Sequence, residues 1–99
     1  MNRLLIAAAL AAAPLAATAQ DSPAARSLAA TCAACHGTDG RSATKEVIGL
    51  AGLPKEHIVS QMKAFRDGTR PATIMHQIAK GYSDQQIELM ADYFSRRPR

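Results

Sequence analysis

Two cysteines and a histidine form the feature that most restricts what this chain can fold into. The only cysteines are Cys32 and Cys35, and both lie in the run Cys32-Ala33-Ala34-Cys35-His36. Cys-x-x-Cys-His is the signature of covalent c-type haem attachment. The spacing puts both sulfur atoms on one side of a helical turn, and His36 then points at the iron. The sequence therefore predicts one covalently bound haem c, with Cys32 and Cys35 as thioether links and His36 as an axial ligand.

Three other interpretations of the cysteine pair remain open. A thioredoxin-like redox disulfide would suit an exported protein, but no βαβ pattern surrounds the motif. A zinc site needs four ligands, and beyond the motif the chain offers only His57 and His76. The third interpretation is a chance occurrence of the motif. Haem is preferred because the N-terminal sequence and the small core, described next, also favour it.

The first 19 residues predict a secretory signal peptide. Arg3 precedes an unbroken apolar run over residues 4–13, and a small-residue cleavage site follows. A transmembrane helix is disfavoured because Pro14 interrupts a run that is already shorter than the ~20 residues needed to span a bilayer. We therefore expect residues 1–19 to be removed and residues 20–99 to form one haem domain in the periplasm, without a transmembrane segment.

The composition of residues 20–99 limits the size of the core. They hold 18 large apolar side chains and no tryptophan. Such a core is marginal unless a disulfide, a metal or a cofactor adds buried surface, and a multidomain enzyme is excluded. Without Arg3 the net charge falls from +4 to about +3, with no long basic run. No nucleic-acid partner is expected.

Helix signals alternate with loops along the chain. Ser22 and Pro23 are an N-cap and a first-turn proline, so a helix should begin there and run into the cysteine motif. Residues 37–52 are rich in Gly, Ser, Thr and Ala, without helical periodicity, and predict a loop over the haem.

Three further helices are expected between residue 54 and the C-terminus. The first spans residues 54–68, a short one spans residues 71–81, and the last begins at a capping box made by Ser83 and Gln86. Their apolar residues recur at helical spacing: Ile58, Val59, Met62 and Phe65; Ile74, Met75, Ile78 and Ala79; and Ile87, Met90, Ala91 and Phe94. Residues 95–99 should form a solvated end. With no strand candidate, we expect an all-α fold of three to four short helices wrapped around one haem.

The sixth iron ligand decides whether such a haem carries electrons or binds gases. Met62 and Met90 lie on apolar stripes, where packing explains them. Met75 follows a turn and lies far enough along the chain for it to return on the other haem face. His76 is its rival as ligand, and His57 is expected to be an exposed helix residue.

The sequence resembles the small class I c-type cytochromes over essentially all of residues 20–99. The haem domains of cytochrome c4 and the cytochrome subunit of flavocytochrome c sulfide dehydrogenase are the most similar groups. The resemblance implies that Met75 is the axial ligand and that the fold is the class I cytochrome c fold. It rests on five stretches of the sequence: residues 32–40, 50–52, 61–68, 73–83 and 90–94.

Two departures from these families affect the site. The families commonly carry a proline whose carbonyl holds the proximal histidine, and the matching residue here is Ile48, so His36 is expected to rest on another carbonyl. Some relatives contain two haem domains, whereas this sequence has one motif. A di-haem relay within this sequence is therefore not expected.

The predicted function is transfer of single electrons between redox partners through a His/Met-ligated haem, without bond chemistry and therefore without enzyme activity of its own. The alternative is the electron-accepting cytochrome subunit of a sulfide dehydrogenase, docked on a flavoprotein. A five-coordinate haem for gas sensing or peroxidase chemistry would require Met75 to be a core residue only. Five basic residues are candidates for a weak electrostatic docking face: Arg41, Lys45, Lys63, Arg66 and Lys80.

Overall fold

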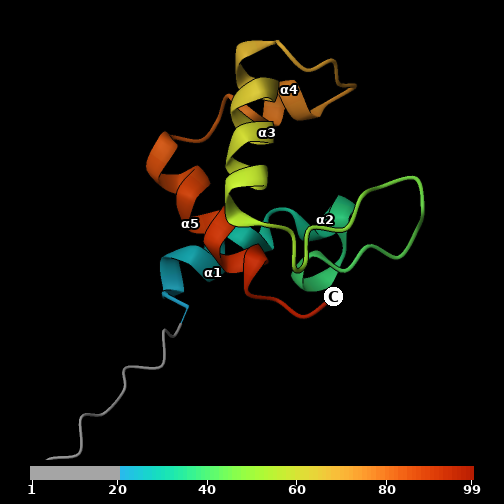
Figure 1. The fold of residues 1–99 in the computed structure, drawn as a ribbon, viewed down its shortest axis with the longest axis vertical. Coiled ribbons are helices and arrows are strands. Elements are labelled where there is room, and N and C mark those ends of the chain that lie inside the picture. The colour runs from blue at the N-terminus through green and yellow to red at the C-terminus, as the bar shows by residue number, and fades with distance from the viewer. Residues whose placement is uncertain (1–20) are drawn as a thin grey trace, which may run out of the picture.

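The computed structural model of the chain describes residues 21–99 and contains only helices and loops (Figure 1). The predicted signal peptide, residues 1–19, lies outside the described residues. Five α-helices and one 3₁₀ turn follow in order: α1 (Pro23–Ala30), α2 (Ala33–His36), η1 (Thr38–Gly40), α3 (Lys55–Asp67), α4 (Met75–Ala79) and α5 (Asp84–Ser95). No strand occurs between residues 21 and 99, and none of the helices there is long and apolar enough to cross a membrane. The predicted all-α class is confirmed.

The predicted helix ends agree closely with the structure. Ser22 caps α1 by accepting a hydrogen bond from the backbone N–H of Ala25. Ser83 and Gln86 form the predicted capping box at the start of α5. Gly68 ends α3 in the left-handed conformation, which glycine adopts without steric cost. These ends were predictable because each depends on contacts within one helical turn.

Two details of the helices differ from the prediction. The cysteine motif forms a separate one-turn helix, α2, after a turn at Thr31 and Cys32, which brings the number of α-helices in residues 21–99 to five. The segment after Pro71 stays non-helical as far as Ile74, so α4 has only five residues, fewer than the two turns expected.

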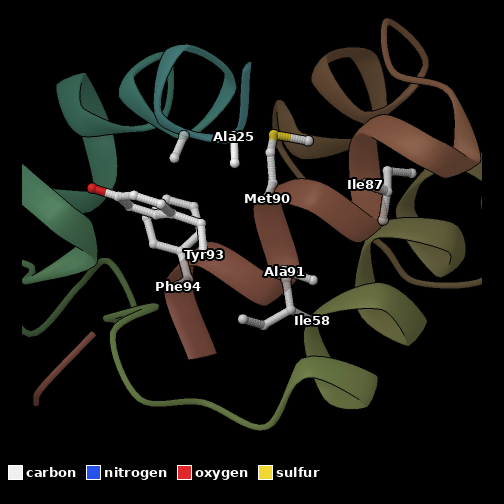
Figure 2. Packing of buried hydrophobic residues seen from close by; sticks show 8 residues of the cluster. Ala25, Ile58, Ile87, Met90, Ala91, Tyr93 and Phe94 are labelled. Carbon is white, nitrogen blue, oxygen red and sulfur yellow. The ribbon is translucent and has the colours of Figure 1, made fainter. Parts of the chain in front are cut away.

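The core lies where α5 packs against α1 on one side and α3 on another, while α4 packs against α3. Figure 2 shows side chains of α5 between α1 and α3, with the Tyr93 and Phe94 rings beneath α1. These two rings meet edge to face, 5.5 Å between centroids. Half of the ten buried apolar residues between residues 21 and 99 are alanines, so the helices approach closely.

The predicted solvated end of the chain is wrong for part of residues 95–99. Arg97 places its guanidinium over the Tyr93 ring, 4.2 Å from the centroid, and forms an ion pair with Asp21. Arg41 donates a hydrogen bond to the Pro98 carbonyl. The C-terminal segment therefore lies against the start of α1 and the loop after η1, because its cations find partners there.

Candidate functional site

The cysteine motif forms a tight helical turn that presents both thiols to one cavity. The backbone N–H groups of Cys35 and His36 donate to the Cys32 carbonyl, at 3.3 and 2.9 Å. Both thiols are free, and both cysteines line the cavity together with His36. The arrangement suits attachment of a group through two sulfur atoms and one imidazole.

His36 is oriented by a backbone carbonyl. Its Nδ1 lies 2.7 Å from the carbonyl oxygen of Ile48. A carbonyl only accepts, so Nδ1 carries the proton and Nε2 keeps its lone pair for a metal. The expectation that another carbonyl takes this place is therefore wrong: Ile48 stands where the families carry proline, and its own carbonyl holds the imidazole. Every residue has a backbone carbonyl, so the proline ring is not required.

The cavity has the character of a cofactor site. Its volume is about 380 Å³, and it lies among the cysteine turn, the loop before α3, and helices α3, α4 and α5. Apolar side chains such as Leu50, Ile58, Phe65 and Ile78 form most of its wall. A small domain leaves such a hollow open only where a ligand fills it. A flat, largely apolar group that takes two thioether links and one imidazole fits this wall.

The structure distinguishes the candidates for the sixth ligand. Met75 lines the cavity, half-buried at the first residue of α4. Met62 and Met90 also line it. Met90 belongs to the core cluster, the buried apolar side chains of α1, α3 and α5, and is 3% exposed, and Met62 packs against that cluster. His57 lines the cavity as well and is exposed, whereas His76 lines a different cavity. Met75 is thus the one methionine at the cavity, within residues 21–99, that neither belongs to the core cluster nor packs against it.

The thiols do not have the properties of a redox disulfide. Burial raises the pKa of the Cys32 thiol, against a weaker opposing effect of the Thr31 hydroxyl 4.0 Å away. Redox-active cysteines of Cys-x-x-Cys motifs have lowered pKa values that favour the thiolate. The environment of Cys32 therefore disfavours the thioredoxin-like interpretation.

A contact that the sequence did not predict lies at the cavity wall, next to Cys32. The hydroxyls of Thr31 and Tyr82 are 2.8 Å apart, and both residues line the cavity. The bond joins the turn before α2 to the turn before α5. Because 51 residues separate its partners, no spacing rule could have predicted it.

The predicted basic docking residues differ in their solvent exposure and in whether they already form ion pairs. Arg41, Lys45 and Lys80 are exposed. Arg66 instead forms an ion pair with Asp84 at 2.6 Å, which lowers the pKa of that carboxyl. Lys63 is half-buried on α3, and Arg70, which was not predicted, is the basic residue at the cavity wall.

Comparison with known proteins gives consistent results at the levels of family, sequence and structure. The family model described as cytochrome c matches residues 22–96. The cytochrome subunit of sulfide dehydrogenase from Chlorobaculum tepidum is 40% identical over 67 residues, which cover 68% of this chain and 60% of that protein. Cytochrome c4 from Pseudomonas aeruginosa is 36% identical over 97 residues, which cover 96% of this chain and 48% of that protein.

A solved structure shows the same fold. The cytochrome c4 of Acidithiobacillus ferrooxidans superposes with a TM-score of 0.66 at 30% sequence identity, covering 79% of this chain and 52% of that one. The chain thus spans about half to three fifths of the length of these relatives.

Proposed function

Because this chain belongs to the cytochrome c family of electron-transfer proteins that bind haem c covalently, we propose that it carries single electrons in the bacterial periplasm, with His36 and Met75 as the axial ligands of its iron. The predicted signal peptide and the similarity to bacterial cytochromes support the location. The observation that carries the ligand assignment is that one cavity is lined by Cys32, Cys35, His36 and Met75.

The residues of the cavity have separate tasks in this function. Cys32 and Cys35 hold the group through thioether bonds, so it stays bound in both oxidation states. The Ile48 carbonyl keeps the His36 ring in one orientation and one tautomer. The apolar wall excludes water, which favours the state of lower charge. When bound, the haem supplies an iron that cycles between ferrous and ferric states without breaking bonds.

Replacement of single methionines tests the ligand assignment. The oxidised protein should show the weak near-infrared charge-transfer band of methionine bonded to iron. Met75→Ala should abolish this band, whereas the matched variant Met62→Ala, also at the cavity wall, should retain it. Loss of the band in Met62→Ala with retention in Met75→Ala would refute the assignment.

A second candidate function is that of an electron-accepting subunit in a sulfide dehydrogenase, where a separate flavoprotein oxidises sulfide. The similarity to the cytochrome subunit from Chlorobaculum tepidum supports it. A stable subunit interface buries well over ~1,000 Å² and is largely apolar, whereas a diffusing carrier docks through a smaller charged face.

The rate of haem reduction at rising ionic strength separates the two candidates. Reduction by a flavoprotein and sulfide that persists in high salt would support the subunit. Rapid reduction by unrelated periplasmic donors, with a steep loss of rate in salt and no reduction by any flavoprotein, would support the general carrier and eliminate the subunit.

A further inference from the structure

A second cavity lies beside the turn that connects α3 to α4. Its volume is about 300 Å³, and it shares two wall residues, Phe65 and Arg70, with the haem cavity. Its charged and polar lining comes from both helices and the turn: Arg66, Asp67, Arg70, His76 and Lys80. This volume is at the low end for ligand sites, so it suits a small ligand.

Arg70 brings to this cavity a positive charge that no carboxylate among residues 21–99 neutralises. Its guanidinium lies over the Phe65 ring, 4.6 Å from the centroid, and donates a hydrogen bond to the side-chain oxygen of Gln61. Both partners are uncharged. The backbone N–H of Arg70 donates to the Ala64 carbonyl at 3.2 Å, which ties the turn to the end of α3. Arg70 is therefore a fixed cation with its charge still available.

Lys80 adds a second positive charge to the cavity, and His76 also lines it. Lys80 is exposed and forms no ion pair within residues 21–99. The Nδ1 atom of His76 is buried and has no hydrogen-bond partner in the same part of the chain.

The negative charges near the cavity are largely committed to Arg66. Asp84, next to the cavity, pairs with Arg66 at 2.6 Å, and Asp67, in its wall, lies 3.8 Å from the same guanidinium. The three basic wall residues outnumber the one acidic wall residue. The cavity is therefore net positive even with Asp84 included.

We propose that this second cavity is a binding site for a small inorganic oxyanion of the phosphate or sulfate type. Arg70 supplies a planar fork of donors that matches two oxygens of such an ion, and Lys80 supplies a mobile point charge. None of the residues proposed to hold the haem lines this site, although Phe65 and Arg70 also line the haem cavity.

Calorimetric titration of the haem-loaded protein with inorganic phosphate, at constant ionic strength against chloride, tests the site. Saturable binding of about one phosphate per chain is expected. Arg70→Gln and Lys80→Gln should each weaken it about tenfold, the usual loss for one charged hydrogen bond. Arg26→Gln removes the same charge from an exposed position on α1 and should leave binding unchanged.

Amide NMR shifts locate the site and give a second readout. Phosphate should shift the resonances of residues 66–80 in the wild-type protein, and the same shifts should need about tenfold more phosphate in Lys80→Gln. Lys80 does not line the haem cavity. Absence of saturable binding, or equal weakening in Arg26→Gln, would overturn the proposal. Acetate binding as tight as phosphate binding would also overturn it, since the cavity would then recognise carboxylates such as those of a protein partner.

Discussion

At the scale of single residues, the site depends on backbone groups as much as on side chains. Ile48 exposes 54% of its surface, yet its carbonyl fixes the tautomer of His36. Gly37 follows the histidine and turns the chain away with φ 82° and ψ 167°, a region that is essentially restricted to glycine. A Cβ atom at Gly37 would lie 1.9 Å from the Arg41 carbonyl oxygen. Only glycine can therefore occupy position 37 without strain, where the backbone changes direction directly after the haem motif.

Replacement of Gly37 should destabilise the protein far more than replacement of Gly68. Both have positive φ, but a Cβ at Gly68 would meet nothing within 4 Å. Gly68→Ala should cost about 1–2 kcal/mol for the left-handed backbone alone. Gly37→Ala adds the clash with Arg41 and should cost at least about 2 kcal/mol more. Urea unfolding of the haem-loaded variants measures both free energies of unfolding. If Gly37→Ala and Gly68→Ala lost equal amounts, the predicted clash at Gly37 would be wrong.

At the scale of elements, α5 is the central helix of the core, because it packs against both α1 and α3 and supplies most of the core cluster. Its predicted stripe of Ile87, Met90, Ala91 and Phe94 is buried. Tyr93, outside that stripe, is also buried, at 6% exposure, because α5 has α1 on one side and α3 on another. The Tyr93 hydroxyl donates to the Asp39 carboxylate at 2.6 Å, which raises the pKa of the tyrosine. The buried face of a helix with two neighbours is wider than one stripe.

The capping box of α5 should contribute measurably to stability. Ser83→Ala removes the acceptor of the Gln86 backbone N–H and should lower the free energy of unfolding by about 1 kcal/mol. Ser60→Ala is the matched control, because Ser60 is solvent-exposed in the middle of α3. This replacement should change the free energy of unfolding by no more than about 0.5 kcal/mol. Chemical denaturation of both variants makes the comparison. If Ser60→Ala lowered the free energy of unfolding as much as Ser83→Ala, the cap would not be the cause of the effect.

At the scale of the whole molecule, the cavity and the core are parts of one packing arrangement. Buried Ile58 and Phe94 face both the core cluster and the cavity. In the described part of the chain the core has five large buried side chains and five alanines, so a bound haem would supply much of the apolar surface that the helices enclose. The folded state should therefore depend on its cofactor.

The apoprotein should lose most of its helical structure. Cys32→Ala/Cys35→Ala prevents covalent attachment and leaves the cavity of about 380 Å³ without its ligand. Far-ultraviolet circular dichroism should show this loss, whereas Met75→Ala, which keeps both thioether cysteines, should remain helical. A cooperative, fully helical apoprotein would show that the core closes without haem.

The sequence by itself determined those features that depend on contacts a few residues apart. The haem motif, the caps at Ser22 and Ser83 and the stop at Gly68 are local patterns, and all could be predicted. So could the all-α class, because the helical periodicities leave no strand candidate. The position of Met75 after a turn and the family resemblance both pointed to it as the axial ligand, and that role stays a prediction.

Only the tertiary structure decided the contacts between distant residues. The Ile48 carbonyl meets His36 across 12 residues, Tyr82 meets Thr31 across 51, and Arg97 meets Asp21 across 76. The second cavity also depends on how the turn after α3 is folded back. Such contacts follow from how the helices pack around the cavity, and a local pattern holds no information about which distant group will lie opposite.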